Sequence, residues 1–527
     1  MSRYNQKVKR TVETVTNHQG GTGVKYDPKL ELIAILTTGL DNSYYEKLSD
    51  RENRFVQLID ELSKKDIEFV AKALVYARTV VGQRSVTHFG SVSLVKHLSG
   101  SAIGKRFFSK RDKNGKTGGI VYRLDDVLEI IAAYQHFNPG KPLPNSMKKG
   151  FKMALESADA YELAKYQGKG KAVSLVDVIN LVRPKPTTPQ MEGVFKDLMT
   201  GKLKQFNTIE DKNSKAGQDV AAKVKSGEIT KAQAEVELTH AKESNYSELI
   251  ATRKIGYMAL LRNLRNIIQN GANPELIKGA CDLLTDERLI RKSLIFPHQI
   301  DIALEVLLQE VSSSAARPFV TALNKAYELA IPNLVELFSH GRTAVVIDTS
   351  GSMHGGYGSY ASMNGKKINA NPIDKAALIG ATLAKGIGAD LYQFSSSTEE
   401  IRYNPSDSIN TIKNTCLNQQ GRVGHGTDFG SIFTRLQSSG KYDRIFIISD
   451  LQGGDRIVTN SPFQTYKSKH GEPFIYTVDI QGYGTTMFKP GNKLVQLFGY
   501  SADIYEMIKK AEIDPKAILR EIEAIVI

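Results

Sequence analysis

The chain has 527 residues, of which 41% are hydrophobic, and its formal net charge is +14. This length predicts two or three domains, and we find no apolar run near the roughly 20 residues that a membrane-spanning helix needs. The basic N-terminus has no apolar core of the secretory kind and the only cysteines, Cys281 and Cys416, lie far apart, so we expect a cytoplasmic protein without disulfides.

Residues 28–340 show one amphipathic helical pattern after another. In the first, DPKLELIAILTTGL, Asp27 is the expected N-cap and Pro28 the first helical residue. A second, DIEFVAKALVYARTVVG, is expected to end at Gly82. Further segments of this kind are RLDDVLEIIAAYQHF, SLVDVINLV, YMALLRNLRNII, NPELIKGACDLLTD, QIDIALEVLLQEV and RPFVTALNKAYELAI. Such a series predicts stacked helical pairs, a mainly α, HEAT-like α-solenoid.

Two other stretches before residue 340 need separate interpretations. Residues 209–249 are polar and rich in Lys and Glu, which predicts an exposed helical hairpin, with partial disorder as the alternative. GGTGVK at 20–25 has the glycines of a phosphate-binding loop but lacks the G-x-x-x-x-G-K-[ST] spacing and a preceding strand. We expect it to be a turn that leads into the first helix.

After His340 the pattern changes to short buried strands that alternate with helices. The strand segments are TAVVIDTS, GADLYQFSS, DRIFIISD and PFIYTVDI, and the helical ones are PIDKAALIGATLAKGI and DFGSIFTRLQSSG. This alternation predicts an α/β doubly wound, mostly parallel sheet with helices on both faces. We therefore divide the chain into a helical domain, 1–340, and an α/β domain, 341–527.

The positive charge belongs almost entirely to the helical domain. Residues 341–527 contain 20 Lys and Arg against 18 Asp and Glu, and subtraction from the chain totals of 70 and 56 leaves 50 against 38 for residues 1–340. A basic surface attracts polyanions with little sequence preference. RNA or DNA binding and a merely solvated, lysine-rich surface are both compatible with this charge.

The segment VVIDTSGSM (345–353) ends a predicted strand with one carboxylate and two hydroxyls at alternate positions. A phospho-aspartyl hydrolase would need a second carboxylate two residues after its nucleophile, and Ser350 holds that place. A divalent cation such as Mg²⁺ instead requires several oxygen ligands with few charges. Asp348, Ser350 and Ser352 would point the same way in an extended loop, which favours a cation site.

Two more ligands are expected at neighbouring strand ends. GHGTDFG supplies Thr427 just before a predicted helix, and IFIISDLQG supplies Asp450 at the end of a buried strand. This set resembles the metal-ion-dependent adhesion site of a von Willebrand factor A domain. The resemblance implies one open coordination position for a partner's carboxylate or phosphate, so we expect a binding device and no enzyme. The loop at 354–372 would either gate that position or be a disordered surface loop, and we favour the latter.

The combination of basic helices with a von Willebrand factor A domain resembles the TROVE-domain proteins, the Ro ribonucleoprotein family. Four segments of the helical domain carry the resemblance, and VIDTSGSM, GTD and SDLQ match the adhesion-site segments. The four are TNHQGGTGVKYDPKLELIAILTTGLDNSYYEK (16–47), ALVYARTVVGQRSVTH (73–88), MALLRNLRNI (258–267) and FPHQIDIALE (296–305). Together these segments span nearly the whole chain.

The resemblance implies a fold and a function. In this family the helical repeats close into a monomeric ring with a basic inner surface. The central hole holds single-stranded ends of misfolded noncoding RNAs, and the outer face binds Y RNA. Bacterial relatives work with exoribonucleases such as polynucleotide phosphorylase in RNA maturation, decay and quality control.

Candidate RNA-binding residues follow from the segment 144–188, where the family has a basic cluster. Arg183 takes the place of a family histidine, which puts any histidine-specific role in doubt, although Arg can still stack on a base and grip a phosphate. The candidates are Lys148, Lys149 and Lys152 on one predicted helix, Lys165, Lys169 and Lys171 in the cluster, Arg183 and Lys185 after it, and Arg84, His88, Arg262 and Arg265 elsewhere.

Each candidate has a simpler interpretation as well. A lysine can belong to a solvated helix face, Arg262 can pair with a buried acid, and His88 can be a hydrogen-bonded core residue. At the level of the whole chain, the alternative is a protein-interaction scaffold that captures an acidic partner at the metal site without RNA.

Overall fold

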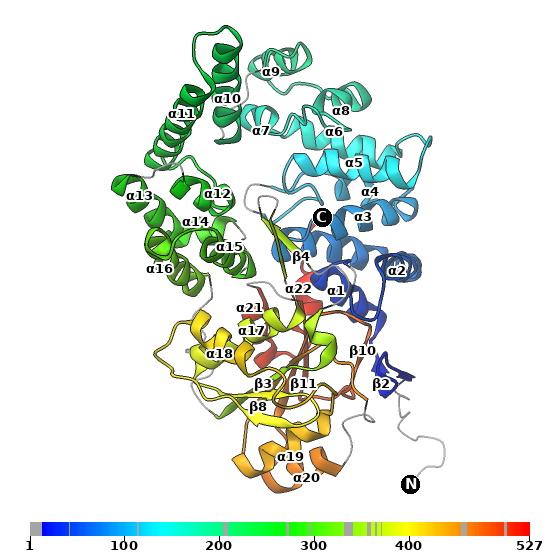
Figure 1. Cartoon of the computed structure of the whole chain (residues 1–527). Coiled ribbons are helices and arrows are strands. Elements are labelled where there is room, and N and C mark those ends of the chain that lie inside the picture. The colour runs from blue at the N-terminus through cyan, green and yellow to red at the C-terminus, as the bar shows by residue number, and fades with distance from the viewer. Residues whose placement is uncertain are drawn as a thin grey trace.

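A computed structural model describes residues 13–527 except 42, 113–114, 204–208, 270–272, 294, 296, 331–340, 356–359, 364–365, 370, 455–460 and 500–502. The chain forms a long series of helices and an α/β unit, and Figure 1 shows the helices following one another along an arc. Within the described ranges, no helix has the length and apolar character needed to cross a lipid bilayer.

The N-terminal part is helical apart from one β-hairpin. The hairpin consists of β1 (Thr14–Thr16) and β2 (Thr22–Lys25). The helices that follow are α1 (Pro28–Thr38), α2 (Leu48–Tyr76), the π-helical turn η1 (Ala77–Val81), α3 (Ser85–Leu94), the 3-10 turn η2 (Val95–His97), α4 (Gly104–Phe107), α5 (Asp125–Phe137), α6 (Asn145–Glu156), α7 (Ala160–Lys165), α8 (Leu175–Val182), α9 (Pro189–Met199), α10 (Ile209–Lys225), α11 (Lys231–Ala251), α12 (Tyr257–Gln269), α13 (Pro274–Leu284), α14 (Glu287–Ser293), α15 (Pro297–Glu310) and α16 (Ser313–Leu329).

The ends of the first helices agree with the sequence signals. The Asp27 side chain accepts a hydrogen bond from the Lys29 amide at the start of α1, and Pro28 is the first helical residue. The π-helical turn ends at Gly82, whose φ of 86° is a left-handed conformation that favours glycine. The polar stretch 209–249 forms the predicted hairpin of helices α10 and α11.

The α/β unit contains a mixed six-stranded sheet. Its elements are β3 (Thr343–Asp348), the 3-10 turn η3 (Gly351–His354), β4 (Tyr360–Met363), β5 (Lys366–Asn369), α17 (Pro372–Ile387), β6 (Asp390–Phe394), β7 (Thr398–Glu400), α18 (Ile409–Gln419), α19 (Phe429–Ser439), β8 (Arg444–Ser449), α20 (Ser461–His470), β9 (Phe474–Asp479), β10 (Thr485–Thr486), β11 (Leu494–Phe498), α21 (Asp503–Ile513) and α22 (Ala517–Glu523). The strand order is β11-β9-β8-β3-β6-β7, and all neighbours are parallel except β6 and β7.

Helices cover both faces of this sheet, which explains why β3 and β8 are almost continuously apolar. Figure 1 shows α17 and α18 on one side of the sheet and α19 and α20 on the other. Gly380 allows α17 to approach β3, because a Cβ there would lie 2.5 Å from Ile347 Cδ1. The carboxyl ends of β3, β8 and β9 consequently share one edge of the sheet.

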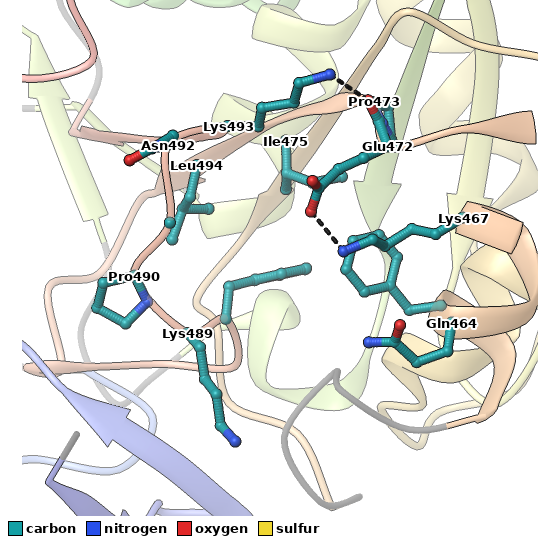
Figure 2. Close-up of a pocket in the computed structure, with 13 residues that line it drawn as sticks. Gln464, Lys467, Glu472, Pro473, Ile475, Lys489, Pro490, Asn492, Lys493 and Leu494 are labelled. Atoms are coloured by element: carbon teal, nitrogen blue, oxygen red, sulfur yellow. Dashed lines mark hydrogen bonds and ion pairs between the residues drawn. The ribbon is translucent and has the colours of Figure 1, made fainter. Parts of the chain in front are cut away.

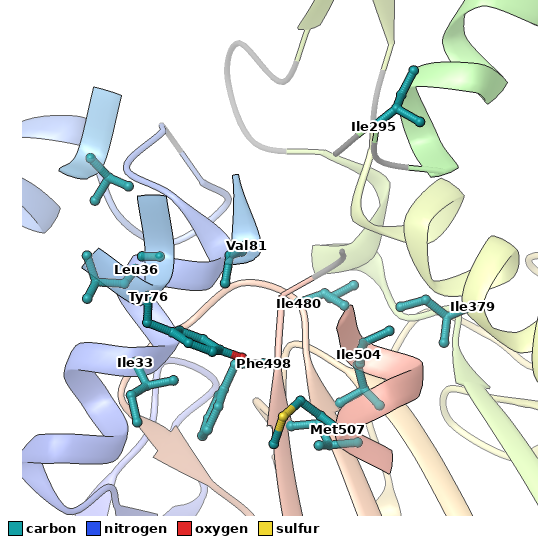
Figure 3. Packing of buried hydrophobic residues seen from close by; sticks show 14 of the residues in the cluster. Ile33, Leu36, Tyr76, Val81, Ile295, Ile379, Ile480, Phe498, Ile504 and Met507 are labelled. Carbon is teal, nitrogen blue, oxygen red and sulfur yellow. The ribbon is translucent and has the colours of Figure 1, made fainter. Parts of the chain in front are cut away.

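Both ends of the helical series contact the α/β unit. At the N-terminal end, β2 pairs with β10, and apolar residues of α1 and α2 lie in one buried cluster with Phe498 and Met507 (Figure 3). At the other end, Lys413 of α18 reaches Asp301 of α15 with an N–O distance of 2.6 Å. The helical series therefore begins and ends on the α/β unit.

Two local expectations differ from the structure. GGTGVK is not simply a turn, because Thr22–Lys25 forms β2, whose backbone groups pair with β1 on one side and β10 on the other. The loop 354–372 includes the two-stranded sheet β4–β5, in which backbone pairing satisfies groups that a disordered loop would leave to water. The division at 340 falls at the end of 331–340, which lies outside the described residues.

Candidate functional site

The first three candidate metal ligands lie where β3 ends. Asp348 is its last residue, and its Oδ1 accepts a hydrogen bond from the Ser350 amide at 2.8 Å. This bond turns the chain so that Ser350 Oγ and Ser352 Oγ lie 3.3 Å apart. Thr349, between Asp348 and Ser350, donates its hydroxyl to the Phe394 carbonyl at the end of the neighbouring strand β6. The loop therefore presents the alternating side chains on one side.

The neighbouring strand β8 brings the second carboxylate to the same edge. Ser449 Oγ donates to Asp348 Oδ2 at 2.5 Å, and Asp450 follows directly. Leu451, the next residue, has a φ of 57°, which is uncommon for a side chain of this size and marks a tightly constrained turn. Asp450 Oδ1 accepts from the Gln452 amide at 3.1 Å.

Thr427 reaches this edge from the loop before α19. Asp428 caps that helix, and its amide donates to the Ser395 carbonyl at the end of β6. The Thr427 carbonyl accepts from the Gly454 amide, which ties the loop to the chain that follows Asp450. The structure thus brings all five predicted ligand residues to the carboxyl edge of β3, β8 and β6.

The chemistry of these side chains fits a divalent cation. Among the described residues, Asp450 Oδ2 and Thr427 Oγ1 are buried without a hydrogen-bond partner, which is costly unless an ion or water satisfies them. Burial raises the pKa of Asp348 to about 6. Burial, followed by repulsion from Asp348, raises the pKa of Asp450 well above its usual value. A bound cation would offset both effects.

The ligand set contains two carboxylates and three hydroxyls rather than a cluster of acids and histidines. Groups of three or more His, Cys, Asp or Glu side chains able to hold a metal do not occur in the described part of the chain. The sequence analysis did not identify Ser449, whose hydroxyl donates a hydrogen bond to Asp348. It also did not identify Asp479, a third buried acid, which is the last residue of β9. Burial raises the pKa of Asp479 to about 6, and its Oδ2 accepts from the Tyr26 hydroxyl at 3.0 Å.

The candidate RNA-binding lysines of α6 lie close to the end of α8. Lys148 and Lys152 are half-buried and Lys149 is exposed. Glu156 Oε1 lies 3.9 Å from Lys152 Nζ and accepts a hydrogen bond from the Lys185 amide at 2.8 Å. The exposed Arg183 ends α8 with a left-handed φ of 48°. The Glu156 contacts therefore hold the chain after Arg183 against α6.

A group of cations and aromatic rings surrounds Lys165. Lys165 Nζ lies 5.3 Å from the ring centre of Tyr161 and 5.4 Å from that of Tyr166. Arg123 lies over Tyr166 at 5.2 Å, and the exposed Tyr161 faces solvent. We call Arg123, Tyr161, Lys165 and Tyr166 the basic platform. The sequence analysis named only Lys165 of these four, although the aromatic residues flanking that lysine in YELAKY were a usable signal.

Lys171 of the cluster, and Arg84, contact acids of α5. Lys169 is exposed, and Lys171 Nζ lies 2.9 Å from Glu129. Arg84 reaches Asp125 at 2.9 Å, and Arg123 contacts the same carboxylate. Arg262 and Arg265 are on α12, which Figure 1 shows on the opposite arm of the arc from α6–α8, so the structure does not bring them to the basic platform.

His88 lies in a buried ionic cluster. Its Nε2 is 3.0 Å from Asp126 Oδ1, and Arg78 donates to the same carboxylate. Burial opposes ionisation of Asp126, but the hydrogen bond from His88 and the charge of Arg78 outweigh it and hold its pKa well below the usual value. The His88 side chain is only 8% exposed, which favours a structural role and leaves it no direct contact surface for RNA.

A pocket of about 370 Å³ lies at the opposite edge of the sheet, where β9 and β11 begin (Figure 2). Ile475 and Leu494 contribute to its apolar lining, and lysines stand around it. Lys467 pairs with Glu472 at 2.5 Å, and Lys493 donates to the carbonyl of the same residue at 2.7 Å. All the residues that line the pocket lie between 463 and 494 in the α/β unit, so we do not include it in the proposed RNA interface.

Comparison with known proteins finds a solved structure with a similar fold. No protein-family model and no curated protein sequence matches the chain. The fold matches the crystal structure of the Deinococcus radiodurans Ro (RSR) protein with a TM-score of 0.57 and 17% sequence identity, over 92% of this chain and 100% of that chain. The chain therefore has the fold of the D. radiodurans Ro protein, and the resemblance to the Ro family inferred from its motifs is confirmed at the level of the fold.

Proposed function

We propose that the protein binds single-stranded noncoding RNA on the surface formed by α5–α8. The basic platform is the observation that carries the proposal, because it combines the exposed ring of Tyr161, over which Lys165 lies, with Arg123 over the neighbouring Tyr166 ring. A base can stack on such a ring, a contact worth about 1–3 kcal/mol, while the cations hold the phosphates on either side. The likeness in fold to a Ro protein supports the same proposal.

The finer features of the Ro family belong to this proposal. The helical arc would close through the α/β unit into a monomeric ring whose central hole takes single-stranded ends of misfolded noncoding RNAs, with Y RNA on the outer face. An exoribonuclease would act on the presented RNA in the cytoplasm. The contacts of both helical ends with the α/β unit support closure. Since Ser350 replaces the acid that a phospho-aspartyl hydrolase needs, we propose a role in binding without catalysis.

The α/β unit is proposed to be a von Willebrand factor A domain with Mg²⁺ held by Asp348, Ser350, Ser352, Thr427 and Asp450. The unsatisfied oxygens of Thr427 and Asp450 support this assignment. A hard cation prefers oxygen ligands, and bound there it would neutralise the charge of the two carboxylates.

Salt-dependent binding of single-stranded RNA tests the proposed interface. Replacing Lys165, Lys169 and Lys171 by alanine removes three cations, so the slope of log K against log salt should fall by about 2 and affinity by roughly 50-fold near 0.15 M salt. The matched control replaces three exposed lysines of the α/β unit, Lys441, Lys469 and Lys489. Equal losses in the two variants would show attraction by net charge alone and refute a local interface.

A further inference from the structure

The edge of the sheet that carries the metal ligands is covered by the chain's own N-terminal segment. β2 pairs antiparallel with β10, with Thr485 opposite Lys25. Upstream of β2, Asn17 Nδ2 donates to the Gly453 carbonyl at 2.8 Å. The His18 amide donates to Gln452 Oε1 at 3.1 Å. Both acceptors lie within three residues of Asp450, so this turn rests directly beside the metal ligands.

Gln452 connects the turn to the site. It is fully buried, its amide donates to Asp450 Oδ1, and its Nε2 donates to Thr485 Oγ1 at 3.0 Å. The same side chain therefore contacts β10 and, through the His18 amide, the N-terminal turn. If the turn moved away, the buried Gln452 Oε1 would lose the hydrogen bond that the His18 amide donates.

Aromatic rings complete the cover. His18 stacks on Tyr45 with ring centres 5.3 Å apart and planes 13° apart, and Tyr483 meets both rings edge-on. The Tyr45 phenol interacts with the side chains of Ser352 and Gln19 and lies within the field of Asp450. We call Asn17, His18, Gln19 and Tyr45 the N-terminal cover.

We propose that the N-terminal cover occupies the outward-facing side of the metal site, so that cation binding and docking of the N-terminal segment stabilise each other. The inference rests on the metal assignment made above and does not depend on RNA binding. A metal site covered in this way differs from an adhesion site, whose open coordination position is available to a partner's carboxylate. The partner of this surface is the chain's own N-terminal cover.

The physical reason for the coupling is the desolvation of charge. Asp348 and Asp450 are fully buried beneath the cover, and no cationic side chain is bonded to either carboxylate in the described part of the chain. Without a cation, opening of the cover would let water solvate these carboxylates, so the closed state is penalised. A bound divalent cation removes most of that penalty and favours closure. By linkage, closure must favour the cation to the same extent.

Two joints connect the helical series to the α/β unit. The N-terminal joint is formed by the N-terminal cover and β2, and the second joint, at α15 and α16, is built from ion pairs. Lys413 pairs with Asp301, and Lys385 Nζ lies 2.8 Å from Glu328. These ion pairs do not involve the metal ligands. Removal of the cation should therefore loosen the N-terminal joint alone, and the second joint serves as an internal control in the same molecule.

Amide hydrogen exchange of the full-length chain in Mg²⁺ and in a chelator tests the proposal. With Mg²⁺ at 100 times its dissociation constant, amides of His18 and Thr22–Lys25 should exchange up to about 100-fold more slowly than in chelator. Amides of α15 and α18 should not change. Asp348→Asn should abolish the difference. Equal exchange at the N-terminal amides in the two conditions, while Mn²⁺ binds, would overturn the coupling but not the metal site.

A reciprocal measurement uses a variant that touches no ligand. Asn17→Ala removes the bond to Gly453 and the turn contacts from the Gln19 and Gly21 amides to Asn17 Oδ1. By linkage, it should weaken Mn²⁺ binding by the factor by which it accelerates exchange at the cover in Mn²⁺, divided by the factor by which it accelerates the same exchange in chelator. Asn404→Ala is the matched control, since Asn404 makes the same kind of turn contact with the Ser406 amide. Unchanged Mn²⁺ affinity in Asn17→Ala, with exchange at the cover accelerated in Mn²⁺ but not in chelator, would overturn the proposal, and absence of Mn²⁺ binding by the unmodified chain would overturn the metal site as well.

Discussion

Asp348→Asn should stabilise the metal-free protein and at the same time abolish its response to Mg²⁺. Asp348 is fully buried, and its pKa of about 6 compares with 3.8 for the free side chain. At about 1.4 kcal/mol per pKa unit, ionisation of this group costs the metal-free fold about 3 kcal/mol. Asparagine has nearly the same shape and carries no charge. Its amide oxygen can still accept from the Ser350 amide, and its NH₂ can donate to Ser449.

The pH dependence follows from the direction of the shift. Because the folded state holds the Asp348 proton more tightly than the unfolded state, this group costs nothing below about pH 4. The penalty grows as the pH rises to about 6 and is constant above that value. The advantage of Asp348→Asn in chelator should therefore be largest near pH 7 and disappear in acid.

Thermal unfolding with chelator and with Mg²⁺ provides the measurement. If the α/β unit unfolds as one cooperative unit, about 3 kcal/mol raises the Tm of the variant by roughly 6–12 °C over the unmodified chain near pH 7. Mg²⁺ at 100 times its dissociation constant should add about 2.7 kcal/mol to the unmodified chain and nothing to the variant. A metal-free variant that is less stable than the unmodified chain near pH 7 would refute the electrostatic reasoning.

Three further predictions concern other parts of the chain. Arg78→Met leaves the buried Asp126 without its main cation and should destabilise the fold by about 3–5 kcal/mol in urea unfolding, whereas a neutral effect would show that Arg78 is not the compensating charge. Tyr161→Ala should weaken binding of single-stranded RNA by about 1–3 kcal/mol in fluorescence anisotropy, with Tyr161→Phe close to the unmodified chain, and equal losses in the two would argue against stacking. Gly380→Ala should cost about 1–3 kcal/mol in thermal unfolding, because its Cβ would press on Ile347, and an unchanged Tm would show that α17 can move away from β3.

Local sequence patterns predicted the elements well and their long-range contacts poorly. The Asp27–Pro28 start of α1 and the end at Gly82 follow from capping preferences, which act within a few residues. The pairing of β2 with β10 joins segments from opposite ends of the chain, and GGTGVK alone carries no sign of that partner. Strand pairing of this kind is determined by tertiary packing.

In the candidate site, too, features that depend on local sequence were predicted and long-range contacts were not. Asp348 and Asp450 could be placed at one edge because both follow buried strands of a parallel sheet, and the structure brings them together through Ser449. The environment of His88 could not be read from its neighbours, because its partner Asp126 lies on α5 and the sequence does not show which acid is buried. The basic platform likewise depends on Arg123 reaching Tyr166 across the fold.

Photo-crosslinking of single-stranded RNA to the full-length chain tests the central claim most directly. RNA with 4-thiouridine at each uridine would be crosslinked to the purified protein, and the adducts would be located by mass spectrometry. We predict that most adducts fall on Tyr161, Tyr166 and the residues around them in α6–α8. Adducts confined to residues 341–527, or spread evenly over exposed lysines, would contradict the proposed interface.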